Sequence, residues 1–221
     1  MGRFSDLKDH ALATLHGKWG SFVGITFIYL LLYGIASGFT NSGKLFIGSN
    51  FSTLAIICTC SGVLLTLLMI PMSMGYAIAH LHSSREDIPA EPGDLFYGYK
   101  NFGHVLGTLL LQALAIFGGL ILLVIPGIIL GFAYAMVPYI LHDHPELSAT
   151  ETLQMSRMMM KGHKWEFFLL ELSFIGWAIL CFFTLFIGYL WLAPYIQMTI
   201  TKFYEKLRAE YEGASEENML Q

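Results

Sequence analysis

The chain has 221 residues, of which 55% are hydrophobic and only 13% are charged, and its formal net charge is −4. A soluble domain of this size usually carries about 25% charged residues, so the composition argues against a soluble all-helical core. The acidic balance gives no electrostatic basis for binding nucleic acid. Four stretches contain no charged residue and no histidine: residues 19–43, 45–79, 105–141 and 172–201. Each exceeds the roughly 18 apolar residues needed for a membrane span, which predicts an all-α polytopic membrane protein.

The first element is an expected amphipathic helix over residues 4–18 that lies along the membrane surface and leads into a first span at about 19–39. Ser5 is a plausible N-cap residue for this helix. Four apolar residues recur at helical spacing and form one stripe: Phe4, Leu7, Ala11 and Leu15.

A polar loop over residues 41–50 separates the first span from the second, which we expect at about 53–79 with Pro71 in its later half. Residues 80–104 then form a long polar connection. Prolines and a glycine break this connection, and Asp94 is placed to cap a short helix within it.

The apolar run over residues 105–141 is too long for one span. Its 37 residues would measure about 55 Å as a single helix, and fitting that length into about 30 Å of hydrocarbon needs a tilt beyond the usual range of about 40°. The run therefore folds back, and Pro126-Gly127 is the expected turn because proline suits the first position of a new helix. The predicted spans are 104–124 and 127–141.

Residues 142–164 form the second long polar connection. Ser148 and Glu151 match a capping box, and Gly162 suits a helix C-terminus, so we expect a surface helix between them. Two further spans follow at about 166–186 and 189–203, with the turn at Gly188. These elements make one domain over residues 1–211, followed by a flexible tail at 212–221.

The distribution of basic residues indicates the topology. With six spans, eleven of the twelve Lys and Arg residues lie on one side and Lys44 lies alone on the other. This bias predicts that both termini lie in the cytoplasm. A four-span alternative would export Arg157, Lys161 and Lys164.

Loose repeats indicate three helical hairpins, each preceded by a surface segment. One proline falls in each even-numbered span, where it is a candidate kink: Pro71, Pro138 and Pro194. Short related motifs precede the odd-numbered spans: His16-Gly17-Lys18-Trp19, Tyr99-Lys100-Asn101-Phe102 and Gly162-His163-Lys164-Trp165. An internal repeat accounts for this register.

Four stretches of the chain carry a resemblance to a known family: Leu7-Lys8…Leu15-x-Gly17-Lys18-Trp19-Gly20; Ile125-Pro126-Gly127…Tyr139-Ile140-Leu141-x-Asp143-x-Pro145; Ser156-Arg157-Met158-Met159…Gly162-x-Lys164-Trp165; and Leu172-Ser173-Phe174-Ile175-Gly176-Trp177. In these stretches the chain resembles a bacterial and archaeal membrane family of unknown function, the domain-of-unknown-function family nine-seven-five. Asparagine is common in that family where this chain has His144. The resemblance extends over nearly the whole chain and implies an integral protein of the inner membrane, but it supplies no activity.

Four polar residues are candidates for function. Glu171 lies well inside an apolar run, where an ionisable group is either functional or half of a structural ion pair, with Lys164 or a histidine as the expected partner. Gln112 and Gln197 suit hydrogen bonds between helices better than ligand contacts. Asp143 is the fourth, within His142-Asp143-His144.

Histidine pairs raise the question of a metal site. His80-x-His82 and His142-Asp143-His144 stand at corresponding ends of the second and fourth spans. Imidazole and carboxylate groups bind transition metals, but side chains two residues apart do not converge on one helix face. Favourable imidazolium contacts at helix C-termini are the simpler interpretation. We therefore predict no metal and no cofactor.

No catalytic motif is present in the sequence: H-E-x-x-H, G-x-S-x-G and a P-loop are all missing. The expected function is a non-enzymatic accessory or envelope-maintenance role that depends on membrane lipids, with a protein partner or a second copy of the chain as further candidates. A transporter for small or lipid-like solutes is the alternative, because three proline kinks could surround a cavity open to the cytoplasm. A membrane-embedded enzyme is third.

Overall fold

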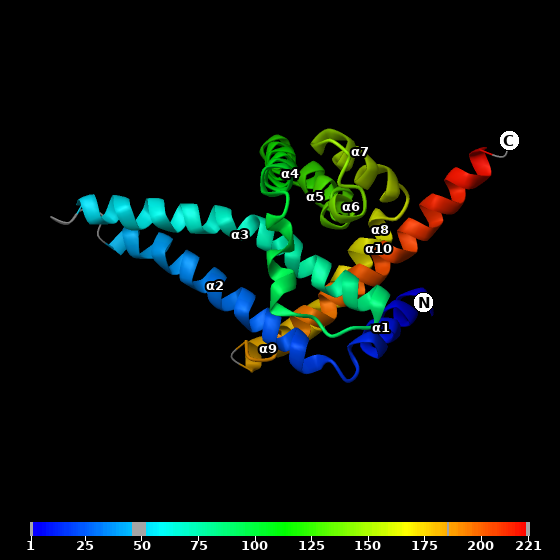
Figure 1. Cartoon of the computed structure of the whole chain (residues 1–221), viewed down its shortest axis with the longest axis horizontal. Helices are drawn as coiled ribbons and strands as arrows, with labels where there is room; N and C mark the ends of the chain where they lie inside the picture. Colours follow the sequence, from blue (N-terminus) through cyan, green and yellow to red (C-terminus); the bar gives the residue numbers. More distant parts are fainter. Residues whose placement is uncertain (1, 46–51, 185, 220–221) are drawn as a thin grey trace.

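A computed structural model describes residues 2–45, 52–184 and 186–219, and all regular structure in these ranges is helical, as predicted. Figure 1 shows three hairpin-like arms that leave one common junction in different directions. Helices α2 and α3 lie side by side across the view, whereas α4 is seen nearly along its axis. The helices are α1 (Gly2–Leu15), α2 (Trp19–Leu45), α3 (Ser52–Glu86), η1 (Pro92–Tyr99, a 3-10 helix), α4 (Phe102–Leu122), α5 (Val124–Ala133), α6 (Val137–Asp143), α7 (Ala149–Met159), α8 (Lys164–Leu172), α9 (Ile175–Phe183) and α10 (Tyr189–Met219).

Within the described ranges, five segments are long and apolar enough to cross a membrane: Trp19–Asn41, Ala55–Glu86, Phe102–Leu122, Val124–Asp143 and Lys164–Phe183. The first two match the predicted spans closely. The predicted sixth span, residues 189–203, forms the first part of α10, and the helix then continues through a charged stretch and the predicted tail to Met219. The fold class of an all-α chain with several potential spans is thus established.

The apolar run over residues 105–141 folds back as its length requires, but the turn lies before the predicted one. Leu123 has extended backbone angles (φ −161°, ψ 141°) and separates α4 from α5. Pro126 falls in the first turn of α5, where its missing N–H has no intrahelical partner to lose. Gly127 does not make the turn. It lets the two helices approach closely, because a Cβ atom there would overlap the side chain of Leu120.

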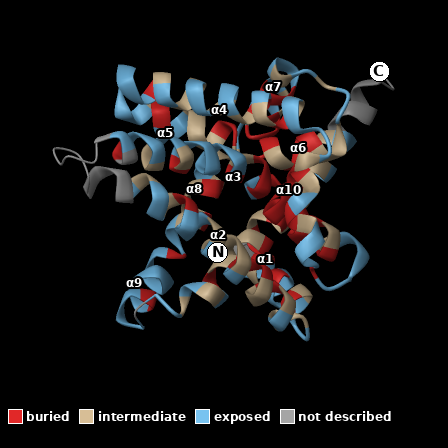
Figure 2. Cartoon of the chain, turned by 60° about the vertical axis from the view of Figure 1, so that its left-hand side comes forward, coloured by how far each residue is buried: buried red, intermediate tan, exposed pale blue. Residues whose placement is uncertain are grey.

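The proline-bearing segments meet at the junction. Buried residues, red in Figure 2, gather where α6 and α10 cross, while the outer parts of the arms are largely exposed. Met74 and Ile78 of α3 pack with Tyr139 and Ile140 of α6 in one apolar cluster that also includes Tyr204 of α10. The hairpins therefore meet at their base instead of packing along their length.

Each surface segment packs against a proline-bearing helix. Segment η1 lies on α3, α7 contacts α6, and α1 contacts α10. The contact between α1 and α10 connects the first helix to the last one, so each of the three proline-bearing helices has one surface segment packed on it. The predicted stripe of α1 points inward, with Ala11 and Leu15 fully buried. The side chain of Phe4 lies outside the described side chains.

Local signals in the sequence agree with the structure at Gly162 and Ser148 and differ from it at Ser5. Gly17 and Gly162 both adopt left-handed backbone angles (φ +80° and +89°) just after α1 and α7, which favours glycine because it lacks a Cβ. The Ser148 capping box at the start of α7 is formed. Helix α1, however, begins at Gly2, so Ser5 is within the helix and does not cap it.

Candidate functional site

Asp143 is the centre of a charged cluster at the junction. Its carboxylate accepts two hydrogen bonds from Arg85, of 2.8 and 2.7 Å, and one of 3.0 Å from Arg208. The Tyr204 hydroxyl donates a further bond of 2.7 Å, and His142 Nδ1 lies 2.9 Å from the same carboxylate. The side chain of Asp143 is only 5% exposed. One carboxylate thus joins α3, α6 and α10.

The surrounding groups balance the charge of this cluster. A second carboxylate, Glu205, accepts a bond of 2.6 Å from Ser84 and lies 3.3 Å from Lys202 and 3.8 Å from Arg85. Burial, together with the negative charge of Asp143, raises the pKa of the Tyr204 phenol. Tyr204 therefore stays neutral and acts as a hydrogen-bond donor. A satisfied cluster of this kind suits a structural connection between hairpins.

Two histidines from different helices meet beside the cluster. The Nε2 atoms of His82 and His142 lie 3.1 Å apart, and Asp94 of η1 lies 3.7 Å from His82 Nδ1. His80 points elsewhere: it is fully buried and its Nδ1 lies 2.8 Å from the carbonyl oxygen of Tyr76. Across the described residues, no group of three or more His, Cys, Asp or Glu side chains is arranged to hold a metal ion.

Gln112 lies where a proline leaves a backbone carbonyl without its helical partner. Pro138 has no N–H to donate to the carbonyl of Tyr134, four residues earlier. The Gln112 side chain donates to that oxygen at 3.1 Å, and the Val137 N–H also reaches it at 3.2 Å. Ser156 of α7 donates to the preceding carbonyl, that of Ala133, at 2.9 Å.

The other predicted polar residues have different surroundings. Gln197 donates to the Tyr139 hydroxyl at 2.8 Å, and this hydroxyl lies 3.1 Å from that of Thr201. Glu171 is in α8 and its side chain is partly buried. Among the described residues, its carboxylate has no hydrogen bond or ion pair, so the pair expected with Lys164 or a histidine is not formed. Asp143 alone of the four joins the cluster.

A cavity of about 770 Å³ opens beside α7, and three basic side chains line it: Arg157, Lys161 and Lys164. The opposite wall comes from α4 and is apolar, with Leu111 and Ala115. None of the three cations forms an ion pair or a hydrogen bond with a residue in the described part of the chain. This cavity therefore has one positive wall and one apolar wall.

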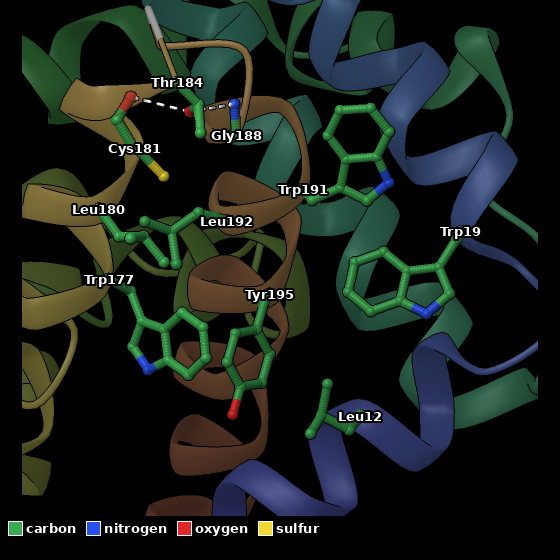
Figure 3. A pocket seen from close by; sticks show the side chains of 10 residues that line it. All are labelled: Leu12, Trp19, Trp177, Leu180, Cys181, Thr184, Gly188, Trp191, Leu192 and Tyr195. Carbon is green, nitrogen blue, oxygen red and sulfur yellow. Dashed lines mark hydrogen bonds between the residues drawn. The ribbon is translucent and has the colours of Figure 1, made fainter.

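A second cavity, of about 350 Å³, lies between α1, α2, α9 and α10. Figure 3 shows that Trp19, Trp177 and Trp191 surround it with Tyr195 and Leu12. The hydrogen bonds drawn in Figure 3 are both made by the Thr184 hydroxyl, which donates to the carbonyl of Cys181 and accepts from the N–H of Gly188. The cavity is nearly all apolar and adjoins exposed apolar helices, so it resembles a surface that faces lipid.

Sequence reasoning missed most of the partners of Asp143. Arg85, Tyr204 and Arg208 are between 58 and 65 residues from it in the chain. One available signal was the presence of two arginines near the ends of proline-bearing spans. The basic residues beside α7 were used only to assign topology, although their spacing already placed them near one another.

Among the comparisons with known proteins, only the protein-family models gave a match, and it covers residues 113–211. Searches of curated proteins and of solved structures found no match. The matched part of the chain includes Asp143, Arg208 and all three basic residues of the cavity, whereas Arg85 lies outside it. The predicted family resemblance is confirmed for residues 113–211, which match the family model described as "Protein of unknown function (DUF975)".

Proposed function

We propose that this chain is a non-enzymatic accessory protein of the inner membrane, which acts by binding lipid through its cytoplasmic surface. The observation that supports this proposal is that charged and polar side chains gather at the junction, whereas the exposed side chains of the arms are mainly apolar. Charged clusters, the histidine pair and the segments α1, η1 and α7 surround the junction, while the arms expose large apolar side chains such as Leu122 (81%) and Phe183 (77%). Apolar arms suit lipid, and the charged base suits the membrane–water interface.

The topology that we propose has six spans with both termini in the cytoplasm. The first part of α10, residues 189–203, would be the sixth span, and its charged continuation would extend into the cytoplasm. The basic residues support this assignment, since six spans leave Lys44 as the only basic residue outside.

We also propose that the three hairpins are copies of one unit. Three features support this: the shared left-handed glycines after α1 and α7, the prolines near the junction, and the pairing of one surface segment with each proline-bearing helix. The segment before α4 differs, since Asn101 has φ −121°. In an ancestral repeat, this copy would have diverged most.

A transporter remains the alternative proposal, and it depends on a polar cavity that reaches the middle of the membrane. Glu171, Gln112 and Gln197 were the residues expected to line it. None of them lines the cavity beside α7, the cavity between α1, α2, α9 and α10, or a third cavity beside Met158 and Tyr211. The accessory lipid-binding role therefore has more support.

The direct test is purification of the full chain in a mild detergent, followed by mass spectrometry of retained lipids and proteins. We expect lipid to be retained in defined stoichiometry after washing with fresh detergent. A preparation that holds neither a lipid nor a protein partner would contradict the proposed function. Uptake of a solute into proteoliposomes, with no lipid retained, would favour the transporter.

A further inference from the structure

We propose that the cavity beside α7 binds an anionic phospholipid, with the headgroup phosphate on Arg157, Lys161 and Lys164 and an acyl chain on the apolar face of α4. This inference rests on the proposed function, because it identifies the class of lipid and the place where it binds. It follows from the unpaired cations, the apolar wall opposite them and the way in which α7 is held.

The three cations differ from the basic residues of the junction, which have carboxylate partners. Arg85 and Arg208 bind Asp143, and Lys206 lies 2.7 Å from Glu166. Arg157, Lys161 and Lys164 line one cavity and have no such partner in the part of the chain that the structure describes. Like charges that share a surface repel one another, so an anion in the cavity would stabilise this arrangement.

The surface segment that carries the cations is fixed to the protein. Its start is held by the Ser148–Glu151 capping box, and the buried Ser156 hydroxyl bonds to the carbonyl of Ala133. The left-handed Gly162 then turns the chain so that Lys164, the first residue of α8, faces the same cavity as Arg157. A preorganised set of donors loses little entropy on binding.

The opposite wall distinguishes a lipid from a free phosphate. Leu111 and Ala115 line the cavity from α4, and exposed apolar side chains continue along that helix at Leu114 (68%) and Phe117 (62%). An inorganic anion would make no use of this surface, whereas an acyl chain would cover it. Trp165 is 68% exposed beside Lys164, and tryptophan at such a position is typical of the headgroup level of a membrane.

The polar groups in the rest of the cavity also suit a headgroup. Thr150 and Gln154 line it together with the cations. Hydroxyl and amide groups can bond to the ester and glycerol oxygens of a phospholipid, and the cations supply the charge-assisted bonds that phosphate oxygens prefer. A volume of about 770 Å³ accommodates a headgroup with the start of its chains.

The test compares the full-length wild type with two triple variants purified in a mild detergent. The first variant is Arg157→Gln, Lys161→Gln and Lys164→Gln. The second removes three cations that lie in or just after α1 and η1, with the same change in net charge: Lys8→Gln, Lys18→Gln and Lys100→Gln. Binding of dimyristoyl phosphatidylglycerol and dimyristoyl phosphatidylcholine is measured by native mass spectrometry, after circular dichroism has verified that each variant is folded.

We expect the wild type and the second variant to prefer phosphatidylglycerol, and the first variant to lose that preference. Each Lys or Arg near an anionic lipid surface raises affinity roughly fivefold, so removing three should weaken binding of phosphatidylglycerol by roughly 100-fold. Inorganic phosphate and glycerol phosphate serve as competitors without chains, and we expect neither to displace the lipid at millimolar concentration.

Three results would overturn the inference. They are equal loss in both triple variants, no loss in the first variant, and complete displacement by inorganic phosphate. If the first variant kept full binding of the retained lipid, the inference would fail and the proposed function would stand. If the wild type bound neither phospholipid and retained nothing on purification, both would fail.

Discussion

Arg85 donates hydrogen bonds from both terminal nitrogens of its guanidinium group to the carboxylate of Asp143, at 2.8 and 2.7 Å. The pair joins the end of α3 to the end of α6, and Asp143 is almost completely buried there. Planar two-point pairing of this kind is the strongest ion-pair geometry available to arginine. The first two hairpins are therefore connected through one carboxylate.

We expect Asp143→Asn to destabilise the protein, since Arg85 and Arg208 would then face a neutral amide. Breaking a fully buried pair costs about 3–5 kcal/mol. The arginine side chains are 29% and 36% exposed, so about 2 kcal/mol is the expected loss. Unfolding in detergent, followed by circular dichroism, measures it.

The matched control for this variant is Glu212→Gln, which removes the other carboxylate bound to Arg208. That pair is on the surface, with Glu212 53% exposed, and such pairs contribute less than about 1 kcal/mol. Equal stability of Asp143→Asn and Glu212→Gln would mean that the cluster does not hold the hairpins together.

The contact between η1 and α3 depends on two glycines that face backbone. A Cβ atom at Gly98 would overlap the carbonyl oxygen of Pro71, and one at Gly75 would overlap that of Leu95. Gly98→Ala should therefore push η1 away from α3 and cost about 1–3 kcal/mol. In the same 3-10 helix, a Cβ at Gly93 meets nothing within 4 Å, so Gly93→Ala is the control. If the two variants melted at the same temperature, the close approach would be unsupported.

Local features were predictable from the sequence because they depend on neighbouring residues. The capping box at Ser148, the stop at Gly162 and the need for the run over residues 105–141 to fold back all follow from patterns within a few turns of chain. The predicted position of the fold-back was wrong. A proline is tolerated anywhere in a first helical turn, so Pro126 did not specify where α5 starts.

Long-range features could not be predicted in the same way. Asp143 was a candidate on its own, but its partners come from two other helices and nothing in local spacing indicates which arginine it binds. Gln112 was expected to join helices, and the structure adds its acceptor, the Tyr134 carbonyl to which Pro138 has no N–H to donate. Such pairings depend on how the hairpins pack, and a single sequence does not contain that information in any local pattern.

Gln112 can be tested as a substitute for the N–H that Pro138 lacks. Gln112→Leu should cost about 1–2 kcal/mol, because it removes one donor from the Tyr134 carbonyl. In a Pro138→Ala background, the backbone N–H at position 138 becomes available to the same carbonyl, so the cost of Gln112→Leu should fall. A double-mutant cycle from detergent unfolding measures the difference. An identical cost in both backgrounds would show that the two groups act independently.

The capping box predicts a pH dependence for α7. Hydrogen bonds from the Ser148 hydroxyl and N–H lower the pKa of Glu151 from its ordinary value of 4.5. A carboxyl group with a lowered pKa stabilises the fold above its unfolded pKa, and this contribution is lost as the pH falls through the folded pKa. Melting temperatures of wild type and Glu151→Gln should therefore differ at pH 7 and converge below pH 4.5. A gap that is constant from pH 7 to pH 3 would contradict this account.

The number of spans can be decided by labelling single cysteines in intact spheroplasts with an impermeant thiol reagent. The three native cysteines, Cys58, Cys60 and Cys181, are first replaced. Three exposed positions then report on three regions: Asn41 at the end of the first span, Glu91 in the first long connection and Gly213 beyond the basic residues of α10.

With six spans, the reagent should label Asn41→Cys in intact spheroplasts and should reach Glu91→Cys and Gly213→Cys only after permeabilisation. The physical reason is the distribution of basic residues, which favours a cytoplasmic location for the charged stretch of α10 that includes Lys202, Lys206 and Arg208. Labelling of Gly213→Cys in intact spheroplasts would mean that α10 does not cross the membrane and that five segments do. The α10 residues of the Asp143 cluster would then lie on the outer side of the membrane, whereas Arg85 and Asp143 would lie on the cytoplasmic side. This result would therefore also contradict the cytoplasmic surface on which the proposed function depends.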